Sequence, residues 1–361
     1  MSTKQPNMPG YVAGMSEEEL RERFNVEEII KLGSNENPIG PSPLAVEAIR
    51  RVVDSTHRYP PMSDDALKTA FAQHAGEGVS RDQIVTGNGA CDLLSMIADA
   101  YLNSESSCVI CPPTFPVYEF TAKRNGASVL RVDLTTPDLE FDIESIVEAI
   151  GDDTRIVYLC SPNNPTGTLL TQSQFDTITD AIPGDTMIVF DDVYHHFVTD
   201  EEAANPVERI ESSRKIIAVR SFSKVYGLAG MRLGYAVAHP DVASRIAAYR
   251  LPFHINALTT QAGLAAIGDR DHITNTVATV VRGRDFLIEK LSSMEVDIWP
   301  SQANFVLFKV ENSGAVVEEL MKAGIIVRPM DTFYLPGYLR VTVGRKDDNE
   351  RFIEVLRSII D

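Results

Sequence analysis

Residues 155–167, with the sequence RIVYLCSPNNPTG, decide the fold class of this 361-residue chain. The run Ile156-Val157-Tyr158-Leu159 is apolar on both faces, which is typical of a strand that other elements cover on each side. Two asparagines between prolines follow it. A second such run, Ile188-Val189-Phe190, leads into the acidic residues Asp191 and Asp192. This pattern predicts a mostly parallel α/β sheet whose polar groups gather at the carboxyl ends of the strands.

Short apolar runs alternate with helix-period segments through the middle of the chain. They predict a mostly parallel, seven-stranded sheet in a large domain over residues 51–284. After a long helical stretch over 271–294 the pattern changes, which predicts a smaller α+β domain made of residues 1–50 and 285–361. The expected strands are 83–86, 107–111, 128–133, 155–160, 187–191, 215–220 and 232–238 in the large domain, then 305–310, 325–327 and 339–343.

Composition excludes several classes of protein. Hydrophobic residues make up 44% and charged residues 23%, values typical of a globular protein with a core. No stretch approaches the roughly 18 apolar residues of a membrane helix, and the first ten residues hold no apolar run that would form a secretory signal. With 33 basic and 51 acidic residues, the net charge of −18 opposes non-specific binding to nucleic acid or anionic lipid. The four cysteines fit a reducing cytoplasm, where we expect the protein to be located.

Polar clusters follow several of the expected strands. The turn Thr86-Gly87-Asn88-Gly89-Ala90-Cys91-Asp92 precedes a helix over 93–101, and backbone N–H groups at such a helix start suit a phosphate. Considered alone, an ordinary helix entry with Asp92 as a first-turn acid is the simpler interpretation. Likewise Asp191 and Tyr194 place a carboxylate and a phenol near the sheet edge, where either could be structural.

The most informative segment is 221–234, SFSKVYGLAGMRLG. Lys224 and Arg232 are its only charged residues, and two hydroxyl groups, Ser221 and Ser223, precede the lysine. A lysine among so many apolar residues is expected to be buried. A buried lysine has either a lowered pKa or a covalent role, so Lys224 is a candidate catalytic residue.

Several motifs in register resemble the fold-type I, pyridoxal 5′-phosphate (PLP)-dependent aminotransferases, and the flanking segments most resemble the histidinol-phosphate aminotransferase branch. The resemblance runs from about Tyr11 to Gly344. Two departures are Cys91-Asp92 in place of an acidic pair and Phe115 in place of the more usual tyrosine. The motifs are YVAG (11–14), GSNENP (33–38), RYP (58–60), NPTG (164–167), Asp191 with Tyr194, Ser221 to Lys224 with Arg232, IVRP (326–329) and LRVTVG (339–344).

The resemblance implies a role for each residue around the cofactor ring. Lys224 would bind PLP covalently and move the substrate α-proton, for which a neutral amine is needed. Asp191 would face the pyridine nitrogen and keep it protonated. Asn164 and Tyr194 would hydrogen-bond the 3′-oxygen, and Phe115 would stack on the ring.

The resemblance also implies how the cofactor phosphate and a second subunit are arranged. Tyr59 would reach the phosphate of the neighbouring subunit, which makes a homodimer the expected working unit. An anion held by helix-end amides and a guanidinium fits the physics of such a site. The phosphate would lie on the backbone of Gly89, Ala90 and Cys91, with Ser221, Ser223 and Arg232 completing the site.

For the substrates, the resemblance implies that Arg340 binds a carboxylate, that Arg328 and Tyr11 hold the distal anionic or polar end, and that Asn35 lies at the substrate site. The expected reaction is ping-pong transfer of the amino group of L-histidinol phosphate to 2-oxoglutarate, giving imidazole acetol phosphate and L-glutamate, a step of histidine biosynthesis. Aromatic amino acids are an alternative substrate class, and PLP-dependent decarboxylation of a phosphorylated amino acid is an alternative reaction. A transcription regulator with this fold would need a basic DNA-binding extension, which the sequence lacks.

Two motifs could suggest a metal. Cys108-x-x-Cys111 has the spacing of half a zinc site, but residues three apart in a strand point to opposite faces, and no second pair completes a site. The neighbouring pair His195-His196 alternates faces for the same reason. We therefore expect no metal.

Overall fold

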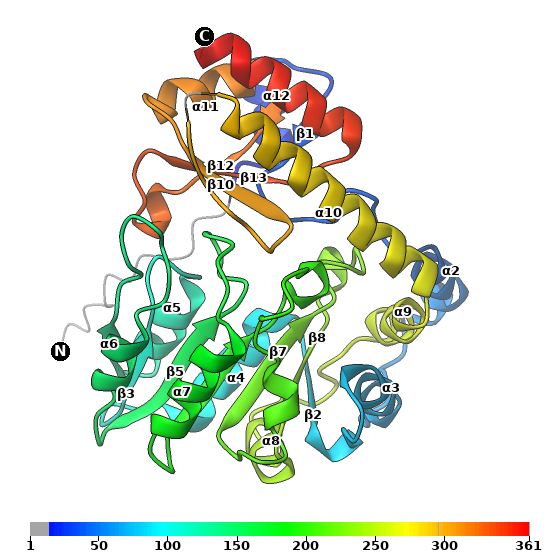
Figure 1. Ribbon diagram of the computed structural model, residues 1–361. Coiled ribbons are helices and arrows are strands. Elements are labelled where there is room, and N and C mark those ends of the chain that lie inside the picture. Colours follow the sequence, from blue (N-terminus) through cyan, green and yellow to red (C-terminus); the bar gives the residue numbers. More distant parts are fainter. Residues whose placement is uncertain (1–13, 295, 361) are drawn as a thin grey trace, which may run out of the picture.

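The computed structural model describes residues 14–294 and 296–360. Its large domain is built on a seven-stranded sheet with the strand order β2-β8-β7-β6-β5-β3-β4, in which only β8 runs antiparallel to its neighbours (Figure 1). The predicted mostly parallel α/β sheet is confirmed, and the strand ends differ from the predicted ones by at most two residues. The strands are β2 (Ile84–Gly87), β3 (Ser107–Ile110), β4 (Ser128–Arg131), β5 (Thr154–Cys160), β6 (Met187–Asp191), β7 (Ile216–Ser221) and β8 (Gly234–Ala238).

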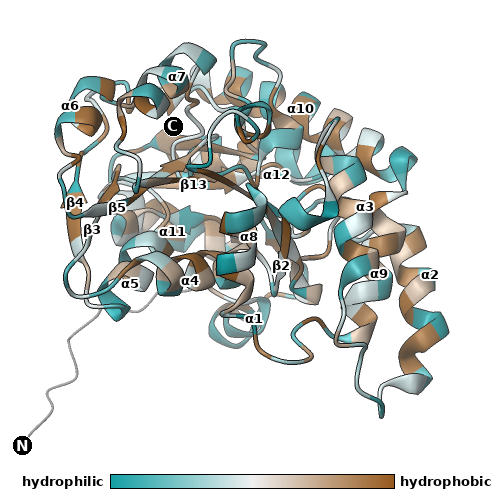
Figure 2. Cartoon of the chain, turned by 90° about the horizontal axis from the view of Figure 1, so that it is seen from below, coloured by the Kyte–Doolittle hydropathy of each residue, from teal (hydrophilic) through white to brown (hydrophobic). Residues whose placement is uncertain are grey.

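Helices cover both faces of this sheet, as the apolar strands require. Alternate residues of β5 enter different core clusters: Ile156 and Tyr158 pack in one, and Val157 and Leu159 in the other. Figure 2 shows polar colour on the outer surfaces of α5 and α8 and apolar colour on strand β2. The first cluster lies under α4 (Ala90–Tyr101), α5 (Val117–Arg124) and α8 (Pro240–Ala247), and the second under α3 (Asp65–Ala75), α6 (Ile143–Glu148) and α7 (Gln172–Ala181).

The small domain holds a four-stranded antiparallel sheet with the order β12-β13-β10-β9. Its strands are β9 (Asp297–Trp299), β10 (Phe305–Lys309), β12 (Arg328–Pro329) and β13 (Tyr338–Thr342). A two-stranded parallel sheet joins β1 (Ile30–Lys31) to β11 (Ile325–Ile326). The helices α1 (Glu17–Phe24), α11 (Ser313–Lys322) and α12 (Lys346–Ile360) pack around these strands.

The expected strand 325–327 agrees with β11 to within one residue, but the neighbouring strand β12 was not predicted. The two strands belong to different sheets. The division follows from their partners, since β11 pairs with β1 near the N-terminus whereas β12 pairs with β13. The strands β1 and β9 were not predicted, because two or three residues are too few to show a period.

Helix α10 (Arg270–Ser292) runs unbroken from the region of α2 (Pro43–Val52) and α9 (Ala257–Ile267) to the small domain (Figure 1). The expected domain boundary at residue 284 falls inside this helix, and the division at that residue stays a prediction. Arg284 itself is buried and donates to the backbone oxygens of Phe197, at 2.9 Å, and Ala303, at 3.4 Å. The helix therefore carries a side chain that joins a large-domain loop to the small domain.

Short 3₁₀ helices complete the described chain at Val53–Ser55, Arg81–Gln83, His195–Phe197, Pro206–Arg209, Ala229–Met231 and Asp331–Phe333. Across the described ranges, no helix combines the length and the apolar character needed to cross a bilayer. All four cysteines are unpaired.

Candidate active site

The carboxyl ends of β5, β6 and β7 open into a cavity of about 230 Å³ that the small domain helps to close. Three segments distant in sequence meet there: the N-terminus of α4, the turn after β7 and residues 34–36. Twelve of the residues expected at the site line the cavity: Asn35, Ala90, Cys91, Phe115, Asn164, Asp191, Tyr194, Ser221, Ser223, Lys224, Arg232 and Arg340. Ser34, Glu36, Cys160, Val193 and Ala229 line it as well.

Lys224 projects its amine into this cavity. Nζ donates a hydrogen bond to the backbone oxygen of Asn35 at 3.1 Å and lies 5.5 Å from the centre of the Tyr194 ring. Burial, assisted by the nearby guanidinium of Arg340, lowers the pKa of Lys224 to about 8. A useful fraction of the amine is therefore neutral near neutral pH, as a nucleophile or base requires.

The turn that carries Lys224 is fixed by the N-terminal segment. The side-chain amide of Asn37 donates to the backbone oxygens of Lys224, at 3.2 Å, and Val225, at 2.8 Å. Gly227 has a positive φ of 66°, and a Cβ there would lie 2.0 Å from the backbone oxygen of Gly40. Only glycine lets the two segments approach so closely.

Asp191, the last residue of β6, is 3% exposed. Its Oδ2 accepts a hydrogen bond of 2.6 Å from the hydroxyl of Tyr118, a residue that the sequence did not single out. Within the described residues, its Oδ1 is buried without a hydrogen-bond partner. Burial raises the pKa of this carboxyl to about 6, against the hydrogen bond from Tyr118, which lowers it. One carboxylate oxygen is thus held by the protein while the other remains to meet a ligand.

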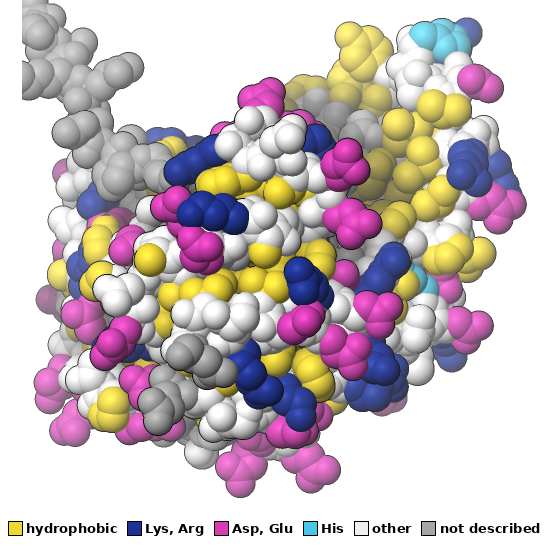
Figure 3. Space-filling view, turned by 90° about the horizontal axis from the view of Figure 1, so that it is seen from above, with side chains coloured by type: hydrophobic (Ala, Val, Ile, Leu, Met, Phe, Trp, Pro, Cys, Tyr) yellow, Lys and Arg dark blue, Asp and Glu magenta, His cyan; other side chains and the backbone are white. Residues whose placement is uncertain are grey.

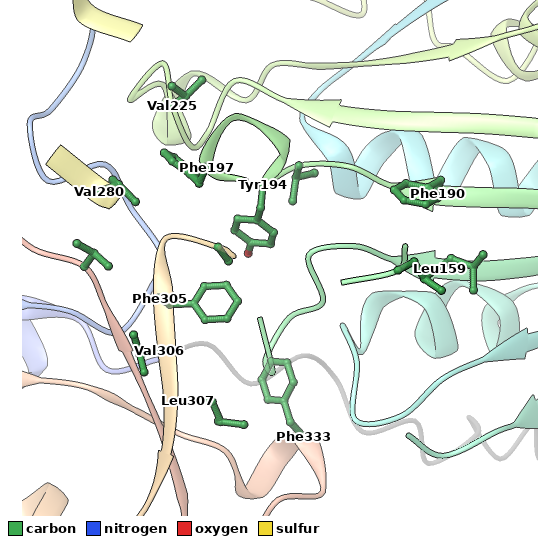
Figure 4. Close-up of a cluster of buried hydrophobic side chains, with 14 of the residues drawn as sticks. Leu159, Phe190, Tyr194, Phe197, Val225, Val280, Phe305, Val306, Leu307 and Phe333 are labelled. Carbon is green, nitrogen blue, oxygen red and sulfur yellow. The ribbon is translucent and has the colours of Figure 1, made fainter. Parts of the chain in front are cut away.

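Tyr194 lies where the two domains meet. Its hydroxyl accepts a hydrogen bond of 3.0 Å from the side-chain amide of Asn35, and its ring packs edge-on against Phe305, 5.3 Å away between centroids. Figure 4 shows the ring between the strands that carry Phe190 and Leu159 and the small-domain strand of Phe305. The phenol therefore occupies a fixed position at the cavity wall.

Arg340 is buried and lines the cavity. Its Nη1 donates to Oδ1 of Asn164, and its Nη2 donates to the backbone oxygen of Gly33 at 3.1 Å. The centre of its guanidinium lies 5.1 Å from the centroid of Phe305. These contacts hold a permanent positive charge at the cavity wall, where it would attract a carboxylate.

The N-terminus of α4 forms the end of the cavity nearest Arg232. Gly89, the residue before this helix, has a φ of 81°, and a Cβ there would lie 2.4 Å from Nη2 of Arg232. The guanidinium donates to the backbone oxygen of Ala229 at 2.9 Å and lies 3.5 Å from Oγ of Ser223. Helix-end N–H groups beside a guanidinium and two serine hydroxyls suit a phosphate, so the residues present fit the expected cofactor.

Arg232 corrects one predicted boundary. The strand was expected to begin at residue 232, but Arg232 has a left-handed conformation, with φ 56°, and β8 begins at Gly234. The hydrogen bond from its guanidinium to Ala229 folds this residue back over the preceding turn instead. Asp92, in contrast, has the structural role of the simpler interpretation, since Oδ2 accepts from the backbone N–H of Asn88 at 2.8 Å and lies 2.7 Å from Nε2 of His254.

Some expected residues lie outside the cavity. Tyr59 is 82% exposed and stacks on Phe253 at 4.6 Å between centroids. Arg328 is buried in β12, directly opposite Arg340 in the strand register, and does not line the cavity. Tyr11 lies outside the described residues, whereas Gly14 is close to Arg328: a Cβ on it would be 2.9 Å from Nη1.

The motifs weighed as metal ligands have structural surroundings. Cys108 and Cys111 belong to core clusters on opposite faces of the sheet. The ring of His195 places Nδ1 2.7 Å from the backbone oxygen of Asp192, and His196 packs against it at 3.8 Å between centroids. Over residues 14–294 and 296–360, no three His, Cys, Asp or Glu side chains form a group that could hold a metal ion.

Sequence reasoning missed the residues that position the others. Asn304 donates to the backbone oxygen of Asn35 at 3.1 Å, and Thr342 bonds both the backbone N–H and the side chain of Asn35. Thr342 lies two residues after Arg340 in a recognised motif, and Tyr118 lies three residues after Phe115 at helical spacing, so both had a signal. Asn304 had none, because it precedes a short strand in an unremarkable turn.

Comparison with known proteins gives a consistent result. The family model described as aminotransferase class I and II matches residues 27–356. A histidinol-phosphate aminotransferase of Moorella thermoacetica is 37% identical over 352 residues, covering 97% of this chain and 90% of the relative. Another from Methanothermobacter thermautotrophicus is 35% identical over 359 residues, covering 97% and 94%.

Solved structures share the fold. The histidinol-phosphate aminotransferase of Sinorhizobium meliloti, in complex with pyridoxal 5′-phosphate, superposes with a TM-score of 0.87 at 24% identity and covers 99% of both chains. An L-threonine-O-3-phosphate decarboxylase of Porphyromonas gingivalis gives 0.80 at 24% identity, covering 92% of this chain and 99% of its own. The family model and the full-length relatives confirm the expected family: the chain belongs to the class I and II aminotransferases.

Proposed function

We propose that this protein is a PLP-dependent histidinol-phosphate aminotransferase, with 2-oxoglutarate as the amino acceptor. The observation that carries the chemistry is the cavity that places the Lys224 amine together with the unpartnered Oδ1 of Asp191. The identity of the substrate is supported by relatives named histidinol-phosphate aminotransferase that align over nearly the whole chain.

Each side of the cavity suits one part of the cofactor. Bound PLP supplies an electron sink for the bonds at the substrate α-carbon. Asp191 would hold a proton on the pyridine nitrogen, and Asn164 and Tyr194 would bond the 3′-oxygen. Phe115 would cover one face of the ring. The phosphate would bind the backbone of Gly89, Ala90 and Cys91, together with Ser221, Ser223 and Arg232.

Lys224 would hold PLP covalently and then act as the base that moves the α-proton. Its lowered pKa of about 8 suits both tasks, since each requires the neutral amine. The backbone oxygen of Asn35 fixes Nζ on the side of the cavity that Tyr194 lines. The lysine is thus directed toward the expected position of the α-carbon.

The two arginines would recognise the anionic substrates. Arg340 would bind the α-carboxylate of glutamate or 2-oxoglutarate through its fixed guanidinium. Arg328 lies opposite it in the strand register, so both side chains project from the same face of the small sheet. With Tyr11, Arg328 would contact the phosphate of histidinol phosphate, and Asn35 would line the substrate site.

A half-reaction assay tests the substrate. Purified protein loaded with PLP is mixed separately with histidinol phosphate, phenylalanine, tyrosine and glutamate, and the visible absorbance of the lysine-bound cofactor is followed. We expect rapid bleaching with histidinol phosphate and with glutamate. Bleaching by phenylalanine, tyrosine and glutamate, with none by histidinol phosphate, would assign the protein to the aromatic branch. Release of carbon dioxide without a 2-oxo acid would indicate a decarboxylase.

We further propose a homodimer in which Tyr59 reaches the neighbouring site. Four large hydrophobic side chains on one side are exposed by 40% to 82%: Tyr59, Met62, Leu251 and Phe253. Figure 3 shows hydrophobic side chains gathered on the side where α2 and α3 lie. Exposed apolar side chains of this size, clustered together, are typical of protein interfaces. The same side holds a groove lined by Tyr59 and Arg232, and Arg232 also lines the phosphate end of the cavity.

Mixing two inactive variants tests this arrangement. A Tyr59→Ala subunit keeps Lys224, and a Lys224→Ala subunit keeps Tyr59, so a mixed dimer holds one intact site. We expect activity to appear when the two variants are unfolded and refolded together, and not when each is refolded alone. Leu251→Asp should weaken the dimer in sedimentation experiments. Tyr334→Ser, which removes a 59% exposed aromatic ring on the small domain, is the control and should not. Monomeric wild-type protein would refute the proposal.

We retain two broader proposals from the sequence. The first is the division into a large domain of residues 51–284 and a small domain of residues 1–50 and 285–361. The second is a cytoplasmic location, which the four unpaired cysteines support.

A further inference from the structure

The two carboxylate oxygens of Asp191 have different surroundings. Oδ2 accepts the short hydrogen bond from the Tyr118 hydroxyl, at 2.6 Å, and Oδ1 has no partner among the described residues. Asp191 is 3% exposed, and its Oδ1 atom is itself buried. A carboxylate in such surroundings favours its neutral form unless a donor stabilises the charge.

Tyr118 is itself held rigidly. It lies in the first turn of α5, is 1% exposed and stacks almost parallel on Tyr158, with 4.9 Å between ring centroids and 13° between planes. Its ring also meets the edge of Phe115, at 5.8 Å and 82°. Because two aromatic contacts fix the ring, the hydroxyl has one position, and that position is on Oδ2 of Asp191.

We propose that Tyr118 is a positioning residue that keeps the Asp191 carboxylate ionised and turns its Oδ1 toward the pyridine nitrogen of the cofactor. Two residues near the start of α5 would then contribute to cofactor binding. Phe115 would stack on the ring face, and Tyr118 would hold the carboxylate of Asp191, which binds the pyridine nitrogen. This inference rests on the role of Asp191 proposed above. Tyr118 acts through Asp191 and does not line the cavity.

Other groups around Asp191 act on the same proton. Lys224 favours the carboxylate by its positive charge, whereas the neighbouring Asp192 would disfavour it by like charge. The thiol groups of Cys91 and Cys160 and the phenol of Tyr194 would also disfavour the carboxylate if they were ionised. The titratable groups that face Asp191 are Cys91 on α4, Tyr118 on α5, Cys160 at the end of β5, Asp192 and Tyr194 after β6, and Lys224 after β7. Of these, Tyr118 alone donates a hydrogen bond to it in the described chain.

The first test measures the carboxyl directly in the apoenzyme, so it does not depend on PLP. Aspartate labelled with ¹³C at its carboxyl carbon is titrated by NMR in wild type, Tyr118→Phe and Tyr158→Phe. Asp191→Asn assigns the signal. Because a hydrogen bond to a charged group is lost, Tyr118→Phe should raise the pKa of Asp191 by about 1 to 2 units.

Tyr158→Phe is the matched control. It removes a hydroxyl that is equally buried, belongs to the stacked neighbour and makes no hydrogen bond in the described chain. The pKa of Asp191 should stay at its wild-type value in this variant. An equal rise in both variants, or no rise in Tyr118→Phe, would overturn the proposal. If Tyr118→Phe does not fold, the wild-type protein provides the test. The ¹³Cζ chemical shift of Tyr118 must then change with pH at the pKa of Asp191, and a shift that does not change there would overturn the proposal.

The second test separates this proposal from the role of Asp191 itself. With PLP labelled by ¹⁵N at the pyridine nitrogen, Tyr118→Phe should shift the nitrogen signal toward the unprotonated form, and Asp191→Asn should shift it further. A signal that Asp191→Asn leaves unchanged would refute the role of Asp191. A signal that responds to Asp191→Asn but not to Tyr118→Phe would refute the role of Tyr118.

Discussion

Gly89→Ala should weaken cofactor binding in addition to destabilising the fold. Gly89 has a φ of 81° and a ψ of 172°, a conformation that non-glycine residues adopt at a cost of about 1–3 kcal/mol. The added Cβ would also lie 2.4 Å from Nη2 of Arg232, so the guanidinium must move. A lost hydrogen bond to a charged group costs about 1.5–3 kcal/mol, which corresponds to roughly a 10- to 150-fold loss of affinity for the cofactor phosphate.

Gly78→Ala is the matched control for the backbone cost. Gly78 also has a positive φ, 82°, but a Cβ there would meet nothing within 4 Å. Both variants should lose stability in denaturant titrations, and only Gly89→Ala should lose PLP affinity when the apoenzyme is titrated with PLP and followed by absorbance. If Gly89→Ala binds PLP as tightly as Gly78→Ala does, Arg232 and the α4 N-terminus do not hold the phosphate.

Three further predictions concern the charged residues of the site. Lys224→Ala should abolish turnover and remove the visible absorbance of bound PLP while leaving the circular dichroism spectrum unchanged; retained activity would refute the assignment. The rate at which the apoenzyme captures PLP should rise about tenfold per pH unit and level off above pH 8, because burial lowers the pKa of Lys224 to about 8 and only the neutral amine reacts; a rate that is flat from pH 6 to 8 in stopped-flow measurements would contradict this. Arg328→Ala should raise the KM for histidinol phosphate by about 10-fold or more, as expected for a lost charged contact, and change that for phenylalanine little; an equal effect on both would remove the phosphate-specific role.

The large sheet could be predicted because its strands are buried on both faces. A run such as Ile188-Val189-Phe190 has no polar position, and the structure places it at the centre of the sheet between β5 and β7. The short strands β1 and β9 carry no comparable signal in the sequence. They are strands because they pair with other strands, and no local sequence pattern marks them. Arg232 misled the prediction for a similar reason, because a hydrogen bond to the preceding turn holds it in a left-handed conformation.

The candidate site was predictable where a residue stands in a recognisable motif. Lys224, Asp191 and Arg340 line one cavity, as the motifs indicated. The residues that hold them were harder to find. Tyr118 contacts the site only through Asp191, and its spacing from Phe115 was its one signal. Asn304 contacts the site only through Asn35, a residue far away in the sequence, and no spacing marks that contact.

The cavity wall joins residues 33–35 to residues 340–342, and this has a consequence for biosynthesis. The bonds from Arg340 to Gly33 and from Asn35 to Thr342 each connect residues 307 positions apart. During translation, residues 33–35 cannot form these hydrogen bonds until β13 has been synthesised. All seven strands of the large sheet precede residue 239 and are synthesised earlier. Contacts between such distant residues form slowly, because the intervening chain must first be ordered. The nascent chain can thus form its central sheet before it can complete the cavity wall. We therefore expect the cofactor to bind after β13 has been synthesised.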